Sequence, residues 1–469
     1  MPTALAEPLK KLAVVGRRSW RSATGRQLLF ATVVGVALRL AWVLWATRSP
    51  SNPFSDAAQY QQIAEGLVDR RTPSIGGVPT AFYPPGWPTA LAPLVWITAK
   101  TGLLSLPFAV ALLNVAAGGA SIGLTAALAG RWIGPGASVP AAWMMAIAPG
   151  AIYFTSTQLA ETWFTAVLLL AMWLLTAVMQ GDRRTPQLVA IGLVVGYAAL
   201  IRSPGLVLLA FPALSARTTD GRWRGALRPT LAVLAGALVV LLPWMVRNGV
   251  QVGVWTPLST NNASFSCVGN GDGASGANDT SETTSRRCYR YSPWDNPVLY
   301  GDDVTGLAEP DEARWYRETL GESVGWMARH PADDVRLAAY KTYLTLGSSQ
   351  DGLVAAEDDG QQPFVRGIPR DLLSRAADVW QWGVLVLGIL GLAFVPRCRR
   401  ALPVWSVAAL QLALIWGGIG MDRYNHPIMP LVVMLAAGTI DALRAGARTP
   451  DAEDQASPAD GASAAGTAA

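Results

Sequence analysis

The sequence predicts an all-α polytopic membrane protein with about ten transmembrane helices, a large outer loop segment and amphipathic helices on its outer face. Hydrophobic residues make up 51% of the 469 residues and charged residues only 15%, whereas a soluble domain carries about 25% charged residues. The apolar residues lie in blocks long enough to cross a hydrocarbon core of roughly 30 Å, rather than in periodic stripes. Basic residues gather at the ends of these blocks. This pattern argues against a string of soluble domains.

The first apolar block covers residues 27–46, and we expect a true span there. It is too long for a cleavable signal peptide, and no small-residue cleavage site follows it. The run 87–99 is short enough to be re-entrant. Arg202–Gly205 ("RSPG") interrupts another block and predicts a tight outer turn between two short spans. The remaining blocks lie near residues 104–130, 134–152, 159–179, 187–216, 226–246, 380–396, 402–420 and 427–446.

Charge predicts the orientation of the chain. Six basic residues precede the first block, so the N-terminus is expected to be cytoplasmic by the positive-inside rule, and the span count brings the C-terminus to the same side. Residues 248–378 hold 19 acidic and 11 basic side chains and are expected outside. Since the basic residues lie at membrane edges, we expect contact with membrane lipids and no nucleic acid partner. Further cytoplasmic turns are marked by Arg183, Arg184, Arg217, Arg222, Arg224, Arg228, Arg397, Arg399 and Arg400.

The chain therefore divides into five predicted regions. They are a cytoplasmic basic N-terminus (1–26), an N-terminal transmembrane module (27–246) with an outer acidic loop (47–86), an outer-face segment (247–379), C-terminal transmembrane helices (380–446) and a disordered cytoplasmic tail (447–469).

The outer-face segment is expected to contain two amphipathic helices and two cysteines. Apolar residues recur at helical spacing on both sides of His330-Pro331, where the proline separates the two helices. Cys267 and Cys288 could form a disulfide in an oxidising exterior. Two free thiols are the equally favoured alternative.

Two acids are expected at the outer mouth of the helix bundle. Asp56 lies about ten residues beyond the first block, before an amphipathic stretch, and Glu161 lies at the outer start of the block 159–179. Asp56 alone favours a helix cap, and a solvated pair is the plain alternative. Carboxylates inside a membrane bundle, however, usually mark a functional site. The two could act as base and charge partner, or as base and ligand of a divalent metal ion.

Cations are expected at the same face. Arg202, Arg247 and Arg423 each lie near the outer end of a block. One such arginine is best explained by contact with lipid headgroups, but several beside acids favour an anionic phosphate. The Ser-, Asn- and Gly-rich stretch Ser259–Gly273 could wrap a phosphate or a sugar. The only two histidines lie far apart in the sequence, which disfavours a two-histidine metal site or a Ser-His triad.

Several stretches resemble motifs of the C-type (GT-C) membrane glycosyltransferases. The resemblance is to bacterial relatives of protein O-mannosyltransferases and of the lipid A aminoarabinose transferase, in glycosyltransferase family 39 and its neighbours. It extends over about residues 27–446. Asn262 stands where the family has a glycine, and residues 267–310 form an unusually long stretch. The matching stretches are "SDAAQY", "YPPGWP", "STQLAETWF", "PWMVRNGVQVGVWTPLSTNNASFSCVGNGDG", "WYRETLGESVGWMARHPADDVRLAAYKTYLTL" and "DRYNHPIMP".

The resemblance implies a hexosyl- or pentosyltransferase with a sugar donor on a polyprenyl phosphate and an acceptor, either a protein, a glycan or a lipid, on the outer face. It makes Asp56 the candidate base, Glu161 a second site acid and candidate metal ligand, and Arg247 and Lys341 candidates for the lipid phosphate. The other candidate substrate-binding residues are Tyr60, Tyr83, Arg202, Asn248, Ser259, Asn261 and Arg423.

A transporter or flippase of lipid-linked sugars is the main alternative function. It would also cross the membrane many times and carry charges among its spans. Transporters often show two related halves and midplane sites, whereas no internal repeat is visible here and the candidate charges lie at the outer rim. A non-catalytic assembly protein is a third alternative.

Overall fold

The computed structural model describes residues 22–446, apart from 53–54, 182–183, 221–222, 280, 290–291, 293–310, 359–360 and 365. The predicted tail 447–469 and nearly all of the predicted N-terminal region lie outside these residues. The longer helices are α2 (Ala23–Ala46), α3 (Asp56–Arg70), α4 (Gly86–Thr101), α5 (Leu106–Trp132), α8 (Glu161–Met179), α9 (Thr185–Ile201), α11 (Leu227–Gln251), α15 (Glu312–Arg329), α16 (Pro331–Leu346), α18 (Ile368–Phe394), α20 (Leu402–Trp416) and α21 (Met429–Gly446).

Short elements connect these helices. The short α-helices are α6 (Ser138–Ala146), α7 (Pro149–Tyr153), α10 (Phe211–Asp220), α12 (Asn262–Gly269), α13 (Glu282–Cys288), α17 (Asp351–Ala356) and α19 (Pro396–Arg400). The 3-10 turns are η1 (Pro135–Ala137), η2 (Phe154–Ser156), η3 (Ser203–Ala210), η4 (Trp223–Gly225) and η5 (Asp422–Asn425). In the part of the chain that the structure describes, strands are limited to the antiparallel hairpin of β1 (Ser74–Ile75) and β2 (Val78–Pro79).

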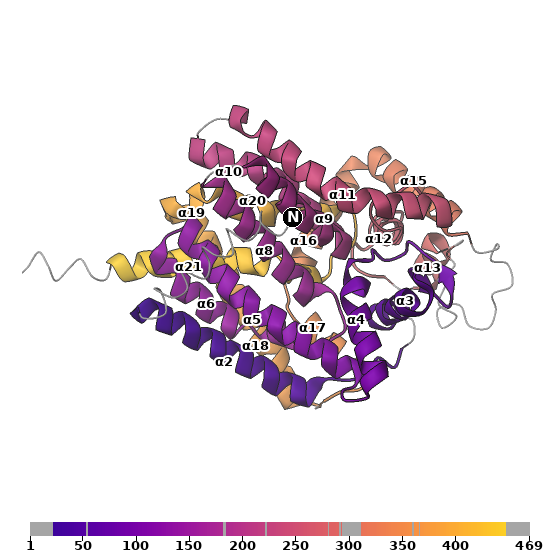
Figure 1. Ribbon diagram of the computed structural model, residues 1–469, viewed down its shortest axis with the longest axis horizontal. Helices are drawn as coiled ribbons and strands as arrows, with labels where there is room; N and C mark the ends of the chain where they lie inside the picture. Colours follow the sequence, from indigo (N-terminus) through magenta and orange to yellow (C-terminus); the bar gives the residue numbers. More distant parts are fainter. Residues whose placement is uncertain are drawn as a thin grey trace, which may run out of the picture.

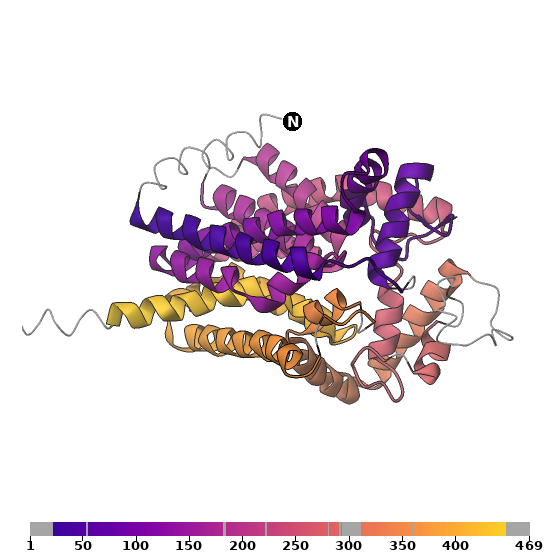
Figure 2. The same ribbon diagram turned by 90° about the horizontal axis from the view of Figure 1, so that it is seen from below.

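The helices form a bundle with a cap of further helices at one end. The long helices run roughly along the long axis, and α3, α12, α13 and α15 gather at one end of them (Figures 1 and 2). By length and composition, six described helices could cross a membrane: α2, α5, α8, α11, α18 and α21. A seventh is added if α6 and α7 form one bent span, and α9 and α20 are shorter apolar helices. The multi-pass architecture is therefore confirmed, and the number of about ten spans stays a prediction.

The predicted span at 134–152 is broken in the structure. α6 and η1 meet α7 and η2 at a bend of 57°, and Pro149 opens the second half, where its missing N–H is tolerated. Arg39 of α2 binds the carbonyl oxygens that the break frees. Its Nη1 donates to Ala146 O at 3.1 Å and its Nη2 to Met145 O at 3.1 Å. The guanidinium thereby replaces intrahelical partners that hydrocarbon cannot supply.

Helices α9 and α11 pack with their backbones almost in contact. A Cβ on Gly192 would lie 2.2 Å from the carbonyl oxygen of Val233, and one on Gly236 would lie 2.0 Å from that of Val189. Such small residues let membrane helices approach closely. After α9 the chain turns at Arg202, and η3 runs back along α9, since a Cβ on Gly205 would meet the backbone of Ala198 and Ala199.

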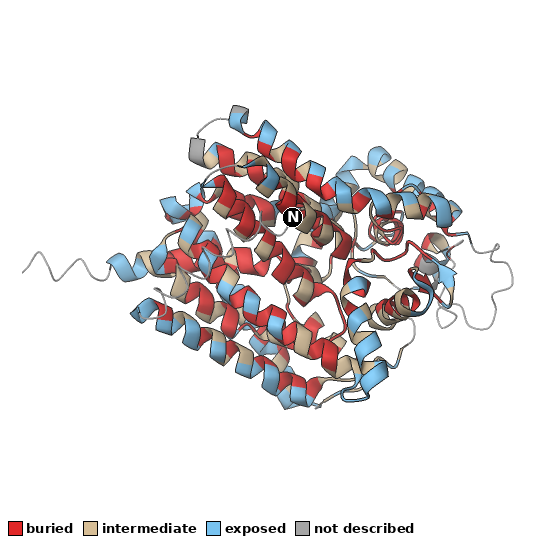
Figure 3. Ribbon diagram, viewed as in Figure 1, coloured by how far each residue is buried: buried red, intermediate tan, exposed pale blue. Residues whose placement is uncertain are grey.

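Burial concentrates in the middle of the bundle. Helix α8 is the most enclosed of the six long candidates, while the outer faces of the surrounding helices and of α15 are exposed (Figure 3). Both predicted amphipathic helices are present as α15 and α16, with the break at His330 and Pro331 as expected. Trp315 is fully buried under α15, and Val324 on the same helix is 52% exposed.

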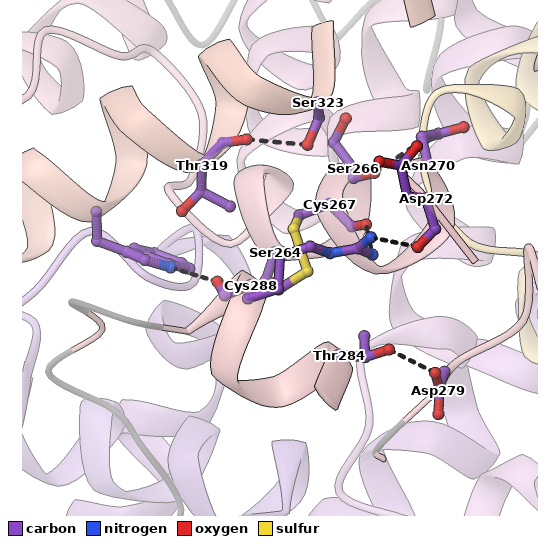
Figure 4. The surroundings of a disulfide bond; sticks show 12 residues. Ser264, Ser266, Cys267, Asn270, Asp272, Asp279, Thr284, Cys288, Thr319 and Ser323 are labelled. Carbon is purple, nitrogen blue, oxygen red and sulfur yellow. Dashed lines mark hydrogen bonds between the residues drawn. A yellow bond between two sulfur atoms is a disulfide. The ribbon is translucent and has the colours of Figure 1, made fainter. Parts of the chain in front are cut away.

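A disulfide closes the cap, deciding between the two alternatives that the sequence left open. Cys267, on α12, is bonded to Cys288 at the end of α13 (Figure 4). Trp315 Nε1 donates to Cys288 O at 2.8 Å, and Arg287 Nη2 donates to Cys267 O at 3.0 Å. The disulfide and these bonds fasten α12 and α13 to α15.

Candidate functional site

Asp56 stands at the start of α3, but it is not the helix cap. Ser55 is the N-cap, and its hydroxyl accepts a hydrogen bond from the N–H of Ala58 at 3.3 Å. The capping alternative for Asp56 is therefore wrong. Its carboxylate instead accepts a hydrogen bond from the Tyr83 hydroxyl at 2.6 Å and forms an ion pair with Arg423 at 2.7 Å. The Asp56 carboxylate thus contacts side chains from two segments that lie far from it in the sequence.

The "YPPGWP" stretch brings these segments together. The backbone at Gly86 lies so close to the end of α9 that a Cβ there would sit 2.5 Å from Ile201 N. Tyr197 donates to Gly86 O at 3.0 Å, and Trp87 Nε1 donates to Gln158 O at 2.8 Å. The end of the first outer loop is therefore fixed against both α9 and the segment that leads into α8.

Arg423 bridges the two predicted acids. It pairs with Asp56 and also lies 3.8 Å from the carboxylate of Glu161. Glu161, at the first position of α8, is only 2% exposed and forms a second ion pair with Arg202 at the end of α9. The guanidinium groups of Arg202 and Arg423 both lie over the ring of Tyr424. Four residues predicted as site residues thus form one charge network.

The network sets the charge of Asp56. Burial alone raises the pKa of this carboxyl group, but the charge of Arg423 and the hydrogen bond from Tyr83 outweigh it and hold the pKa below the ordinary 3.8. Burial and the charge of Asp56 raise the pKa of Tyr83 well above 10. At neutral pH the centre therefore holds an ionised acid and a neutral phenol.

A second pair of acids, Asp351 and Asp422, holds the backbone around Arg423. Asp422 Oδ2 accepts the N–H groups of Gln350 and Asp351 at 2.7 and 3.1 Å, and Asp351 Oδ2 accepts the N–H of Arg423 at 3.1 Å. Burial and the neighbouring Asp422 raise the pKa of Asp351 to about 8. Asp351 therefore keeps its proton at neutral pH. The sequence carried no signal for it, because the two acids are separated by 70 other residues.

Two cavities meet at Asp56 and Arg423. The first, of about 360 Å³, is lined mainly by polar side chains and is called the polar cavity here. The second, of about 480 Å³, is called the apolar cavity. Its walls include Leu206, Leu258, Leu320, Val324, Met327, Leu414, Ile415 and Ile419. The residues that line both cavities are Asp56, Tyr83, Asn261, Phe265 and Arg423.

The other predicted residues divide between the cavities and the scaffold. Tyr60, Arg202 and Ser259 line the apolar cavity, and the ring of Tyr60 lies 4.6 Å from that of Tyr83. Gln411 of α20 also lines it, and neither polar atom of its buried amide has a partner among the described residues. Nothing in the sequence singles out Gln411, since one glutamine in an apolar helix matches no motif.

Arg247 and Asn248 lie outside both cavities. Arg247 donates to Thr80 O at 2.6 Å and to Pro73 O at 2.7 Å. Asn248 donates to Thr256 O at 3.1 Å. Arg247 thus fixes the β1–β2 hairpin to α11, opposite Glu312, whose carboxylate accepts the N–H of Ala81 at 2.9 Å.

Lys341 also lies behind the wall of the apolar cavity rather than in it. It is fully buried on α16. Its ammonium group donates to Asn270 Oδ1 at 2.5 Å and to Trp416 O at 2.7 Å, immediately before the cavity residues Gly417 and Gly418. Burial lowers the pKa of Lys341 to about 8. Its place indicates that it braces the cavity wall.

The two site acids do not form a metal centre in this arrangement. Asp56 and Glu161 are each paired with a guanidinium, and a divalent cation would have to displace those positive charges. Within the ranges that the structure describes, no three His, Cys, Asp or Glu side chains gather as metal ligands do. The donor set therefore fits an anion better than a metal ion.

Comparisons with known proteins identify the fold. Neither models of protein families nor curated proteins match the chain. Among solved structures, the apo Archaeoglobus fulgidus oligosaccharyltransferase has a TM-score of 0.51 and 14% identity, over 91% of this chain and 51% of that chain. This chain thus spans about half its length. The shared fold agrees with the resemblance to GT-C glycosyltransferases.

Two further structures resemble the chain less well. The archaeal oligosaccharyltransferase AglB from Archaeoglobus fulgidus, in complex with an inhibitory peptide and a dolichol-phosphate, has a TM-score of 0.49 and 14% identity, over 90% of this chain and 50% of that chain. ArnT from Cupriavidus metallidurans, bound to undecaprenyl phosphate, has a TM-score of 0.42 and 17% identity, over 91% and 80%.

Proposed function

From the oligosaccharyltransferase fold and the geometry of the site, we propose that this protein is a membrane glycosyltransferase. It moves a sugar from a polyprenyl-phosphate donor to an acceptor on the outer face of the cell membrane. One observation carries the proposal: an apolar and a polar cavity meet at the paired side chains of Asp56 and Arg423. A lipid-linked donor and a water-soluble or surface-bound acceptor need two such compartments with one shared wall.

The apolar cavity suits the lipid end of the donor. Its wall is formed by leucine, isoleucine, valine and methionine from α15, α20 and the turns near Arg202. Arg202 and Arg423 lie at its polar side, where they can hold the phosphate through their planar donor groups. Arg202 and Arg423 take the phosphate-binding role that was expected of Arg247 and Lys341. Those two side chains instead donate hydrogen bonds to backbone and amide oxygens outside the cavity.

The reaction is a displacement at the anomeric carbon. Asp56 takes the proton of the acceptor hydroxyl or amine, the acceptor atom bonds to the anomeric carbon, and the bond from that carbon to the phosphate oxygen breaks. The polyprenyl phosphate leaves with the electron pair, and Arg202 and Arg423 stabilise its charge. When the phosphate engages Arg423, Asp56 loses part of its ion pair, so its pKa rises and it becomes a stronger base.

Glu161 has a supporting place in this scheme. It is almost fully buried, and it pairs with Arg202 while it lies near Arg423. Its negative charge balances the two guanidinium groups when the phosphate is absent. A divalent metal ion at Asp56 and Glu161 has no support from this arrangement.

Transfer of a labelled sugar tests the proposal. Purified protein in detergent or vesicles is incubated with polyprenyl phosphates that carry radiolabelled sugars and with an extract of envelope acceptors. We expect label to move from the lipid fraction to the acceptor fraction. A transporter or flippase would move the donor between leaflets and leave its sugar–phosphate bond intact, so label that stays lipid-linked in every preparation would refute the proposal.

A further inference from the structure

Most of the polar side chains that line the polar cavity are neutral amides and hydroxyls. Five amides and six hydroxyls lie on its wall beside five acidic or basic side chains, those of Arg48, Asp56, Asp351, Asp358 and Arg423. The amide side chains on its wall are those of Asn52, Gln59, Gln158, Asn261 and Asn278. The hydroxyl side chains are those of Ser49, Ser55, Tyr83, Ser156, Thr157 and Tyr289. Amides both donate and accept hydrogen bonds, as sugar hydroxyl groups do.

Gln158 stands out because its amide has no partner. The residue is only 2% exposed, and neither its Nε2 nor its Oε1 has a hydrogen-bond partner within the described part of the chain. Buried amides are normally paired, since an unpaired one costs free energy. The backbone around it is held firmly, with Trp87 bonded to its carbonyl oxygen and Asn114 bonded to that of Thr157. Gln158 thus lines the polar cavity, and its enclosed amide is held there without a partner among the described residues.

Asn261, at the shared wall of the two cavities, supplies a second amide group whose donors are not used in a described hydrogen bond. Its Oδ1 accepts from the Ser264 hydroxyl at 2.7 Å, which fixes the orientation of the amide. Its NH2 group has no partner among the residues that the structure describes. Asp56 and Asn261 line the same cavity, so a ligand held by amides there would lie beside the proposed base.

From these groups we infer that the acceptor is a carbohydrate, and that Gln158 binds one of its hydroxyl groups in the polar cavity. The inference rests on the proposed glycosyl transfer and names the class of acceptor for it. A ligand with hydroxyls on adjacent carbons can bond to the amides of Gln158 and Asn261 together, whereas a fatty acceptor offers these two amides no partner. The donor sugar is the rival occupant of this cavity, and the kinetics below separate the two.

The first experiment compares acceptor classes with the wild-type protein. Labelled donor is offered with an envelope oligosaccharide, a Ser/Thr-rich peptide or a phospholipid. We expect transfer to the oligosaccharide at least about tenfold above the others. Transfer to the peptide or lipid alone would overturn the inference and leave the proposed function standing. Absence of transfer to every acceptor would refute the proposed function itself.

The second experiment asks what Gln158 contacts. Gln158→Leu keeps much of the size and removes both polar atoms, and Gln180→Leu, outside both cavities, is the matched control. We expect Gln158→Leu to lower kcat/KM for the oligosaccharide roughly ten- to a hundredfold, the worth of one hydrogen bond in a buried site. The donor KM should stay within about twofold of wild type. A raised donor KM with an unchanged acceptor KM would place the donor sugar in the cavity and overturn the inference.

Acceptors that lack one hydroxyl each provide a readout that does not depend on the folding of a variant. Wild-type protein should discriminate against one such deoxy acceptor by at least about tenfold. Gln158→Leu should use that deoxy acceptor and the parent acceptor with similar kcat/KM, because the amide that binds the hydroxyl group is absent from the variant. Equal use of all deoxy acceptors by the wild type would show that the protein recognises no single acceptor hydroxyl and would overturn the inference.

Discussion

Arg423 is the side chain on which the candidate site depends. It pairs with Asp56, lies 3.8 Å from the carboxylate of Glu161 and lines both cavities. Its backbone N–H is held by the carboxyl group of Asp351. One residue thus couples the proposed base, the second acid and a buried acid pair.

Replacing Asp56 by asparagine should separate chemistry from structure. Ser55 caps α3 in both forms, and asparagine can still accept hydrogen bonds from Tyr83 and Arg423. We therefore expect sugar transfer to fall by about two to four orders of magnitude, the usual worth of a positioned acid–base group. The thermal midpoint in detergent should change little.

The matched control is Asp311→Asn. Asp311 caps α15 by accepting the N–H of Arg314 and lines neither cavity, and asparagine caps as well as aspartate. Activity near wild type is expected for this variant. Near-normal transfer by Asp56→Asn would remove Asp56 from the chemistry and leave Glu161 as the remaining candidate.

The acid pair beneath Arg423 should make stability depend on pH. A carboxyl group whose pKa is raised on folding binds its proton more tightly in the folded chain, so its stabilising effect is full at low pH. That effect is lost as pH rises from the ordinary pKa of 3.8 to the raised value of about 8 at Asp351. We expect the thermal midpoint of wild type to fall over this range and Asp351→Asn to flatten the profile. Parallel profiles would contradict a raised pKa at Asp351.

At the residue scale, motifs located the acids and arginines but not what each contacts. Asp56, Glu161, Arg202 and Arg423 come together as expected. Arg247 lies in an equally specific motif and yet holds backbone carbonyl groups. A motif fixes the residue type and its place on a helix, whereas the direction of a long side chain depends on neighbours that lie far away in the sequence.

Among the elements, the broken pair α6 and α7 depends on a single buried cation. Arg39 is only 1% exposed on α2, and it donates to the carbonyl groups of Met145 and Ala146 beside the break. Arg39→Met should leave these carbonyl groups unsatisfied in an apolar interior, at a cost of about 1–3 kcal/mol for each group. We expect a lower thermal midpoint and more proteolysis near residue 147. An unchanged midpoint would show that other donors or water serve the break.

The disulfide should stabilise the cap measurably. Cys267 and Cys288 close a loop with a sequence separation of 21 residues, and disulfides closing loops of this size typically contribute about 2–4 kcal/mol. The double variant Cys267→Ser and Cys288→Ser should therefore unfold at a lower temperature. Reductant should lower the midpoint of wild type in the same way and leave the double variant unaffected. An equal response of both proteins would assign the effect of reductant to another site.

Elements were predictable where composition determines them. The break at His330 and Pro331 separates α15 from α16 as expected, because proline ends one helix and can open the next. The bend near residue 147 was missed, although Pro149 lies there, because an unbroken apolar block hides it. The carbonyl groups at the bend accept hydrogen bonds from Arg39, more than 100 residues earlier in the chain.

For the molecule as a whole, the orientation in the membrane remains a prediction that labelling can test. In a Cys398→Ala background, Gly321→Cys on the exposed face of α15 should react with a membrane-impermeant maleimide in intact cells. Arg217→Cys on α10 should react only after the cells are opened. This outcome follows if basic turns face the cytoplasm and the acidic segment 248–378 faces outward. The reverse pattern would place the candidate site on the cytoplasmic side.

The overall architecture was the most predictable level, since hydrophobic blocks report a multi-pass helical membrane protein directly. The two cavities were not predictable. Their shared wall combines Asp56, Tyr83, Asn261 and Arg423, which become neighbours only when α3, the "YPPGWP" stretch, α12 and η5 meet. Tertiary contacts of this kind leave no periodic pattern in a single sequence.

The bridging position of Arg423 has a kinetic consequence. In the resting protein its charge is paired with Asp56, so a water molecule in the polar cavity meets a weakened base. Under the proposed transfer, a carrier phosphate that attracts Arg423 would release the base, so we expect ordered addition with the lipid substrate first. Spent carrier would compete for the same guanidinium. Free polyprenyl phosphate should thus act as a product inhibitor competitive with the donor, and release of the carrier should reset the enzyme for the next turnover.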